Sequence, residues 1–210
     1  MSKSANISMP VIRRLPGYYR TLKVLEEKGI DRISSGKLAE LMNSNASQIR
    51  QDLNCFGGFG QQGYGYIVSD LKEEIAKIIG IDRVKNAVIC GFGNLGKAIY
   101  RHFDDNKYGF ELVGLFDSDK LKQGQSIGKL TIMSEKNIID FCTANNVETA
   151  IICVPTKFAE GVVDLLYEGG VRSFWNFSHF KVSLKYSDVI EENVHLSESL
   201  LTLSYLIDNN

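Results

Sequence analysis

The segment Gly91-Phe92-Gly93-Asn94-Leu95-Gly96 constrains the fold of this chain more than any other feature. It follows the apolar run 87–90 and opens an amphipathic stretch, and a second apolar run follows at 111–116. In a strand, turn and helix of this kind, the first glycine permits a tight turn and the second lets the backbone approach a pyrophosphate. The third glycine lets the helix pack on the strand. The helix N-terminus then offers free N–H groups to phosphate oxygens. The segment therefore predicts a nucleotide site.

An acidic residue closes the second apolar run. Asp117 stands 21 positions after Gly96, where a carboxylate accepts hydrogen bonds from the hydroxyl groups of an adenosine ribose. The same carboxylate would repel a 2′-phosphate, and no Arg follows it directly, so the sequence favours NAD over NADP. ATP and coenzyme A stay open as ligands, because they share the adenosine.

Composition suggests two parts with different partners. The chain has 210 residues, which suits two small domains, and its 44% hydrophobic content supports a core. Residues 1–60 carry nine Lys/Arg and five Asp/Glu, a net charge of +4, and the remainder carries 15 and 20, a net charge of −5. A basic N-terminal part is typical of nucleic-acid binding. A difference of this size also arises by chance.

The cysteines and the apolar runs of the sequence indicate the cellular compartment of the protein. Cys55, Cys90, Cys142 and Cys153 show no CxxC spacing, so neither a disulfide framework nor a metal site is predicted. There is no signal-peptide pattern and no apolar run of the length that spans a membrane. We expect a cytoplasmic protein without a membrane partner.

Three helices are predicted at the N-terminus. Pro16 suits the first turn of a helix that Gly29 closes, and a short second helix follows Ile33-Ser34-Ser35. Asn45 is the expected N-cap of the third helix, with Gln48 placed as in a capping box.

The third helix has two distinct faces. Its apolar stripe consists of Ala46, Ile49, Leu53 and Phe56, and its polar stripe of Ser47, Arg50, Gln51 and Asn54. Short polar groups with an Arg suit base edges and phosphates in a DNA major groove. The alternative is a solvated face, which usually carries more Glu and Lys.

Glycine and aromatic residues alternate from Phe56 to Tyr66. The pattern predicts two short strands around a turn, a hairpin wing after the third helix. A further helix over 71–79 ends at Gly80. Together these elements predict a winged helix-turn-helix domain over residues 1–80.

The rest of the chain alternates between strands and helices. Strands are expected at 86–91, 111–116, 149–154 and 172–176, and helices near 94–104, 135–145 and 157–168. Such alternation predicts an α/β Rossmann domain with a parallel sheet over residues 81–192. A last helix is expected over 193–207, within a C-terminal segment 193–210. Its seam of Leu196, Leu200, Leu203 and Ile207 would pack on a partner subunit or, alternatively, on its own sheet.

The motifs together resemble the Rex family of redox-sensing transcriptional repressors. The segments that carry the resemblance are Arg14–Arg20, Ile33–Ser35, Ile49–Leu53, Phe56–Gly60, Gly63–Tyr66, Gly93–Gly96, Phe116–Asp119, Val154-Pro155 and Trp175–Phe177. The resemblance implies a homodimer whose winged helices bind a palindromic operator in double-stranded DNA. It also implies NADH or NAD⁺ as regulatory ligand, a last helix exchanged between subunits, and release of the operator when the NADH/NAD⁺ ratio rises.

Site residues can be assigned on this basis. The expected nucleotide ligands are Gly91, Phe92, Gly93, Asn94, Leu95, Gly96 and Asp117, and the expected apolar lining of the nicotinamide pocket is Phe92, Val154, Pro155 and Phe177. Such a lining disfavours the charged ring of NAD⁺. The expected DNA contacts are Arg14, Ser34, Ser47, Gln48, Arg50, Gln51, Asn54, Gln61 and Gln62.

Several residues depart from the pattern of the family. Gln61-Gln62 stand where a basic pair is usual, which weakens expected wing contacts to phosphate. His195 replaces an Asp that can pair with an Arg of the first helix, here Arg20, and His102 replaces an aromatic hydroxyl. Ser178-His179 replaces Ala-Pro. With Arg20, His102 and His195 as the expected switch residues, the sequence raises the hypothesis of a paralogue with a weakened NADH response.

Two other functions compete with this assignment. An NAD-dependent dehydrogenase needs a substrate domain, but few residues follow the last Rossmann strand, and His102, His179 and His195 form no catalytic pattern. We therefore expect no enzyme activity. Cys55, at the end of the third helix, is a candidate redox sensor, although no second cysteine is near it in sequence.

Overall fold

The computed structural model describes residues 7–59, 64–103 and 108–209. The chain divides into two compact units, Met1–Asp82 and Arg83–Asn210. Within the described ranges, no helix combines the length and the apolar character that crossing a membrane requires.

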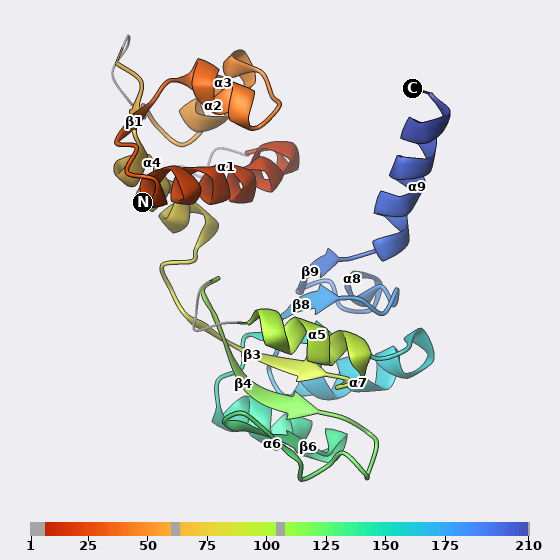
Figure 1. Ribbon diagram of the computed structural model, residues 1–210. Helices are drawn as coiled ribbons and strands as arrows, with labels where there is room; N and C mark the ends of the chain where they lie inside the picture. The colour runs from red at the N-terminus through yellow and green to blue at the C-terminus, as the bar shows by residue number, and fades with distance from the viewer. Residues whose placement is uncertain (1–6, 60–63, 104–107, 210) are drawn as a thin grey trace. The chain divides into compact units, whose positions relative to one another are not determined.

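The first unit is a helical domain with a small sheet (Figure 1). Its described elements are α1 (Met9–Glu27), β1 (Arg32–Ile33), α2 (Ser35–Leu41), α3 (Ala46–Asn54), β2 (Tyr66–Ile67) and α4 (Val68–Ile79). Helix α1 packs against α4, and α2 packs against α3 as a helix-turn-helix pair. Leu15, Tyr18, Leu22, Leu38, Ile49, Leu53, Leu71 and Ile75 form the core between them.

Helix α1 begins earlier than predicted. Pro10 occupies its first turn and Pro16 lies inside the helix, so the placement of Pro16 in the first turn was wrong. The buried positions continue N-terminal of Pro16, at Leu15 and Val11, and this packing offsets the helix bond that a proline cannot make. The predicted end is confirmed, because Gly29 takes the left-handed conformation at φ +70° directly after the helix.

The small sheet also differs from the predicted hairpin. Strand β2 pairs antiparallel with β1, with Ile33 opposite Tyr66, and residues 57–59 form no strand. A Cβ on Gly65 would lie 2.5 Å from the carbonyl oxygen of Ile33, so only glycine allows this approach. Gln61 and Gln62, expected at the wing tip, lie outside the described residues.

The second unit contains a mostly parallel sheet. Its strands are β3 (Lys85–Cys90), β4 (Phe110–Phe116), β5 (Ser126–Ile127), β6 (Leu130–Met133), β7 (Thr149–Ile152), β8 (Ser173–Asn176) and β9 (Ile190–Asn193). They lie in the order β5-β6-β4-β3-β7-β8-β9. Of the neighbouring pairs of these strands, β5 with β6 is antiparallel and the others are parallel. The order reverses between β3 and β7, which confirms the Rossmann architecture and locates its ligand crevice at the carboxyl ends of these strands.

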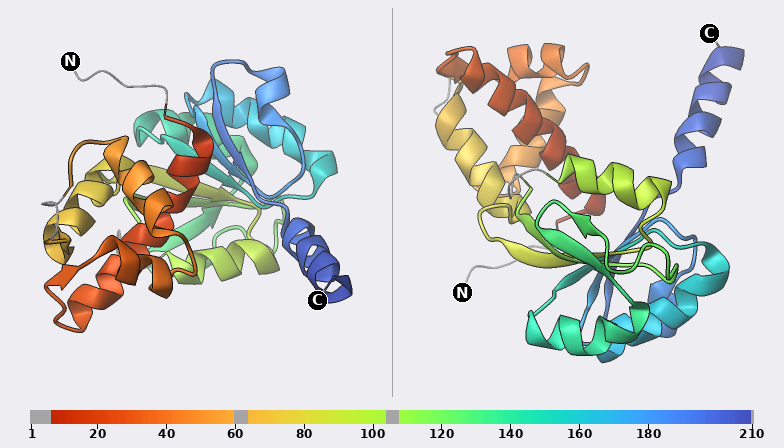
Figure 2. Two further views of the ribbon diagram at one scale, coloured as in Figure 1. Left: turned by 90° about the horizontal axis from the view of Figure 1, so that it is seen from above. Right: turned by 60° about the horizontal axis from the view of Figure 1, so that its bottom comes forward.

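Helices cover the two faces of the sheet unequally (Figure 2). Helices α6 (Ile138–Ala144), α7 (Thr156–Glu168) and α8 (Val182–Lys185), with the 3-10 turn η1 (Glu135–Asn137) before α6, lie on one face. On the other face, α5 (Asn94–His102) packs through Ile99 against Ile89, Leu115 and Ile151. Strands β5, β6 and β9 and helix α8, each of four residues or fewer, were not predicted.

The last helix, α9 (Leu196–Asp208), starts three residues after the predicted position. Asn193 instead ends β9, opposite Asn176 of β8. Figures 1 and 2 show α9 extending away from the sheet, and none of its described residues is buried. Packing of this helix on its own sheet, one of the two alternatives considered, therefore does not occur in the chain.

Candidate nucleotide and DNA sites

The three glycines of the turn after β3 occupy different environments. Gly91 has φ +93°, and a Cβ there would lie 2.8 Å from the carbonyl group of Cys153 and 2.9 Å from Val154 Cγ1. A Cβ on Gly96 would lie 2.2 Å from the carbonyl oxygen of Gly91, whereas Gly93 has no atom within 4 Å of the equivalent position. Glycine at 91 thus permits the backbone conformation of the turn, and glycine at 96 lets the helix pack closely against the turn. Glycine at 93 leaves space beside the turn open for a ligand.

Helix α5 begins at this open space. Gly93 is its N-cap residue, and no side chain makes a capping hydrogen bond to this helix end. The N–H groups of the first turn, which begins with Asn94 and Leu95, therefore need an acceptor from outside the helix. A phosphate oxygen is the acceptor that such a helix end suits best.

Asp117 lies beside the turn, directly after β4, and is 6% exposed. Its Oδ2 accepts hydrogen bonds from the backbone N–H of Phe92 at 2.8 Å and from Lys122 Nζ at 2.9 Å. Its Oδ1 accepts the backbone N–H of Asp119 at 2.9 Å. Burial raises the pKa of Asp117, but these three hydrogen bonds outweigh it and hold the pKa below its ordinary value. The carboxylate is ionised at neutral pH and oriented toward the turn.

Lys122 is a site residue that sequence reasoning missed. Its ammonium group lies between two carboxylates, 2.9 Å from Asp117 Oδ2 and 3.9 Å from Asp119 Oδ2. Lys122 sits in a loop without periodic structure, five positions after Asp117, so no spacing rule marks it. The carboxylate of Asp117 also affects Glu135 of η1. Burial and the negative charge of Asp117 both raise the pKa of Glu135.

The residues expected around the nicotinamide lie in two kinds of place. The ring of Phe92 is 1% exposed and meets Tyr100 edge-on at 5.9 Å, so it belongs to the core beneath the turn. Val154 and Pro155 follow β7, with Val154 against Gly91 and Pro155 at the start of α7. Phe177 follows β8 and meets Trp175 edge-on at 4.9 Å. Asp117, Val154, Pro155 and Phe177 thus follow the carboxyl ends of β4, β7 and β8, which lie on the two sides of β3.

Two histidines meet at the base of α9. His195 is the N-cap residue of this helix, and its Nδ1 lies 2.6 Å from Nδ1 of His179, with the two ring planes 12° apart. A hydrogen bond at this distance requires one ring to donate and the other to accept. Both residues are departures from the family pattern, and sequence reasoning did not connect them.

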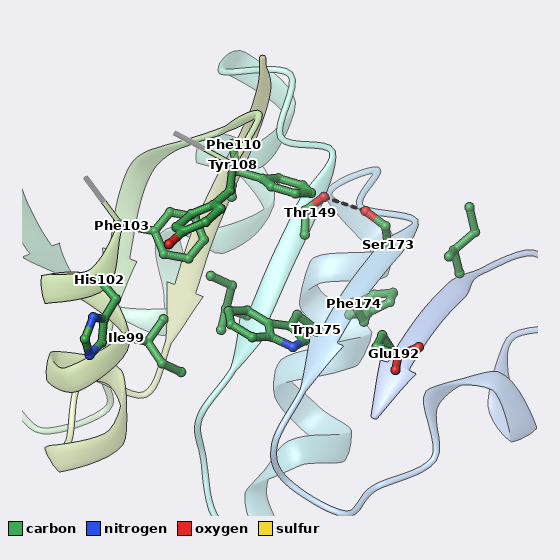
Figure 3. A pocket seen from close by; sticks show the side chains of 13 residues that line it. Ile99, His102, Phe103, Tyr108, Phe110, Thr149, Ser173, Phe174, Trp175 and Glu192 are labelled. Carbon is green, nitrogen blue, oxygen red and sulfur yellow. Dashed lines mark hydrogen bonds between the residues drawn. The ribbon is translucent and has the colours of Figure 1, made fainter. Parts of the chain in front are cut away.

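His102, the remaining expected switch residue in this unit, is exposed at the end of α5, on the rim of an open apolar groove (Figure 3). The groove has a volume of about 680 Å³ and lies on the face of the sheet that carries α5. Trp175 forms part of its floor, and Thr149 and Ser173, neighbours on β7 and β8 that also line it, share a 2.6 Å hydrogen bond.

In the first unit, the polar face of α3 is exposed. Ser47, Arg50, Gln51 and Asn54 all face solvent. Arg50 reaches from α3 to α2, because its guanidinium donates to Ser35 Oγ at 2.9 Å and to Ser47 Oγ at 3.2 Å. Ser34 caps α2 by accepting the backbone N–H of Lys37 at 3.1 Å. The helix-turn-helix thus presents hydroxyl, amide and guanidinium groups on one side.

Two other expected DNA contacts, Arg14 and Gln48, hydrogen-bond to a buried carboxylate. Asp52 of α3 is 1% exposed, and its oxygens accept a bidentate pair from Arg14 of α1 at 2.6 and 2.8 Å. Tyr18 donates to the same carboxylate at 2.6 Å and Gln48 at 2.8 Å. Burial raises the pKa of Asp52, but these hydrogen bonds outweigh it and hold the pKa below its ordinary value. Arg20 lies on α1 and is exposed.

The cysteines differ in burial. Burial raises the pKa of Cys142 to about 11 and that of Cys153 to about 12, which disfavours the reactive thiolate. Cys55, the candidate sensor, is exposed and donates to the carbonyl of Gln51 at 3.3 Å.

Comparison with known proteins follows the same division of the chain. A family model described as "Putative DNA-binding protein N-terminus" matches residues 6–54, and a model described as "CoA binding domain" matches residues 82–180. Curated relatives match over the whole length. The redox-sensing transcriptional repressor Rex of Clostridium perfringens strain SM101 is 48% identical over 100% of this chain and 99% of that protein. Rex of Clostridium acetobutylicum is 47% identical over 99% and 96%.

Solved structures agree. A crystal structure of RSP in complex with β-NAD⁺ and operator DNA matches with a TM-score of 0.90 and 44% identity, over 98% of this chain and 94% of that chain. A structure of RSP in complex with β-NADH matches with a TM-score of 0.88 and 41% identity, over 98% and 96%. A third structure is described as RSP, a Rex-family repressor, with a TM-score of 0.87 and 42% identity, over 98% and 97%.

The relatives are named as transcriptional repressors and not as enzymes. Full-length identity at this level, together with the helix-turn-helix unit and the Rossmann unit, leads to one conclusion. The chain belongs to the Rex family of redox-sensing transcriptional repressors.

Proposed function

We propose that this protein is a cytoplasmic, homodimeric repressor that binds a palindromic DNA operator and releases it when NADH occupies the crevice at Gly91–Gly96. The observation that carries the proposal is that the glycine turn has open space at Gly93 and is hydrogen-bonded, through the N–H of Phe92, to the ionised carboxylate of Asp117. Relatives that match nearly the whole chain were crystallised with operator DNA, NAD⁺ and NADH, which supports both ligands for this chain.

The nucleotide would lie across the crevice between β3 and β7. The helix end at Asn94 and Leu95 suits the pyrophosphate, and Asp117 suits the adenosine ribose. The nicotinamide half would reach Val154, Pro155 and Phe177 at the ends of β7 and β8. The nicotinamide supplies the signal itself, since its ring is positively charged in NAD⁺ and neutral in NADH. An apolar surrounding disfavours the charged ring.

The DNA would contact the exposed polar face of α3. We assign base or phosphate contacts to Ser47, Arg50, Gln51 and Asn54, with Ser34 at the start of α2 beside them. Arg14 and Gln48 fit a different role, because their side chains hold the buried carboxylate of Asp52. They would position the recognition helix rather than contact DNA through these groups. Wing contacts from Gln61 and Gln62 stay predictions.

Two uncovered apolar surfaces support the proposal of a dimer. The exposed side of α9 carries Leu196, Leu200, Leu203 and Ile207, each more than half exposed. The apolar groove on the α5 face of the sheet, lined in part by Ile99, Phe103 and Trp175, is open. A second copy of the chain would cover such surfaces, in keeping with exchange of α9 between subunits. Two half-sites of an operator require a fixed separation of the two recognition helices.

One observation favours a second candidate, a repressor of the same kind with an attenuated NADH response. His195 stands where the family has an Asp, and in this chain it is hydrogen-bonded to His179 rather than offering a carboxylate. A neutral imidazole cannot pair with Arg20 as a carboxylate does, so a contact expected to stabilise one state of the switch is lost. Replacing His195 with Asp should lower the NADH concentration needed for release.

An operator-binding titration tests the proposal. A labelled palindromic fragment, selected from random DNA by the protein itself, is bound and then titrated with NADH, NAD⁺ or ATP. NADH should release the DNA at the lowest concentration. By linkage, the operator should weaken NADH binding by the same factor. Release by ATP alone would overturn the assignment of the ligand.

A further inference from the structure

We propose that Lys122 and Asp117 together set the choice between NAD(H) and NADP(H), and that Lys122 becomes a ligand for a 2′-phosphate once the charge of Asp117 is removed. The inference rests on the nucleotide site proposed above and names the pair of residues that decides its specificity. It concerns the position at which the two classes of nucleotide differ, the 2′-oxygen of the adenosine ribose.

The contact between the two residues is direct and sheltered. Lys122 Nζ lies 2.9 Å from Asp117 Oδ2, with 29% of the lysine side chain and 8% of the aspartate side chain exposed. The same Oδ2 accepts the backbone N–H of Phe92, which begins the glycine turn. The ammonium group therefore lies at the carboxylate that is placed to receive ribose hydroxyls.

The charge balance at this place explains rejection of a 2′-phosphate. Asp117 and Asp119 both pair with the one ammonium group of Lys122, and the partly buried Glu135 adds negative charge near Asp117. Lys122 is already engaged by Asp117, so an incoming phosphate would meet a carboxylate before it met a free cation. Like charges in a sheltered site repel strongly.

Removing one charge would reverse this balance. Asp117→Asn keeps the shape of the side chain and one oxygen that can accept the Phe92 N–H, while the hydrogen bond from the Asp119 N–H is lost. The ammonium of Lys122 would then lack its closest partner and could pair with a 2′-phosphate, a strong charge-assisted contact. Sequence reasoning sought an Arg directly after Asp117 for this role, whereas the structure brings a lysine from five positions along the loop.

The test measures binding of NADH and NADPH separately, by nicotinamide fluorescence, to the full-length protein and four variants. The variants are Asp117→Asn, Lys122→Met, the double variant, and Lys120→Met as a matched control. Lys120 is an exposed lysine of the same loop. Thermal unfolding in the absence of nucleotide shows whether each variant is folded.

Asp117→Asn should raise the affinity for NADPH relative to NADH by at least about tenfold. The double variant should lose that gain, and Lys120→Met should behave as the unaltered protein. The gain persisting in the double variant would overturn the role of Lys122. A folded Asp117→Asn variant that gains nothing for NADPH, or binds neither nucleotide, would also overturn the proposal.

Lys122→Met alone supplies a second readout. Without the ammonium group the pKa of Asp117 should rise. As the pH is lowered, the variant should therefore begin to lose NADH binding at a higher pH than the unaltered protein does. An unchanged pH profile would contradict the positioning role. Failure of the unaltered protein to bind either nucleotide would instead count against the proposed function itself.

Discussion

The backbone N–H of Phe92 donates a 2.8 Å hydrogen bond to Oδ2 of Asp117. This bond joins the glycine turn after β3 to the acid after β4, two features that are 25 residues apart in sequence. It fixes the carboxylate beside the turn before any ligand arrives. A site arranged in advance spends less free energy on ordering when it binds its ligand.

Gly93→Ala should abolish NADH binding and leave the fold intact. No atom lies within 4 Å of the position a Cβ would take, so the methyl group occupies only the space that a pyrophosphate needs. Fluorescence titration with NADH and thermal unfolding measure the two effects. Gly161→Ala, which also meets open space but lies in α7, is the matched control and should retain binding.

Gly91→Ala should behave differently, because it strains the apo protein. The residue has φ +93°, and the added Cβ would meet the Cys153 carbonyl at 2.8 Å. We expect a loss of unfolding free energy of about 1–3 kcal/mol, together with loss of NADH binding. Chemical unfolding followed by the fluorescence of Trp175 reports on this unit, and stability equal to the unaltered protein would count against the described turn.

Asp52→Asn should destabilise the first unit by about 2 kcal/mol, because it removes the charge of a buried carboxylate that pairs with the partly exposed Arg14. The pKa of Asp52 is lowered in the folded state. Its contribution to stability is therefore present above the unfolded-state pKa of about 3.9 and is lost as the pH falls through the folded-state pKa. Hydrogen exchange of backbone amides in α1 and α3 measures the effect. Equal protection in the variant and the unaltered protein at neutral pH would contradict it.

Arg50→Ala should weaken operator binding by about tenfold or more and leave NADH affinity unchanged. Arg50 is exposed on the polar face of α3 and braced by Ser35 and Ser47. Fluorescence anisotropy of a labelled operator measures the loss. Arg101→Ala, the same change at an exposed position of α5, should leave operator binding unaltered. Equal losses from both changes would indicate a general effect of charge and no specific contact.

Leu200→Glu with Leu203→Glu should convert the protein to a monomer and remove tight operator binding. Both leucines are exposed in the single chain, at 65% and 51%, so the change should cost no stability there. Light scattering gives the molar mass. Ser204→Glu, on the same helix but outside the seam, is the control. A variant that stays dimeric would show that α9 does not hold the subunits together.

Much of the fold follows from local patterns. The Rossmann alternation, the glycine turn, the two-faced third helix and the left-handed glycines at 29 and 80 depend on neighbours in sequence. The start of α1 was missed because Pro16 resembles a helix start, while the buried stripe that overrides it continues back to Val11. Strand β2 was given the wrong partner, because its pairing with β1 joins segments that are far apart in the chain.

The candidate site shows the same limit. Asp117 could be assigned from its spacing, but Lys122 could not, since only the folded loop brings its ammonium group to the carboxylate. Arg14 was assigned to DNA because basic residues near a recognition helix often contact phosphate, and this assignment stays a prediction. Its ion pair with the buried Asp52 could not be predicted, because the two residues lie on α1 and α3 and meet only when these helices pack. His179 and His195 meet for the same reason.

The central claim is that occupancy of the Gly91–Gly96 crevice by NADH controls DNA binding. Its most direct test is anisotropy of the labelled operator complex during titration with NADH, beside fluorescence of bound NADH in the same samples. We predict that the DNA dissociates as the nucleotide site fills, and that NAD⁺ requires a much higher concentration. DNA that stays fully bound while NADH saturates its site would contradict the claim.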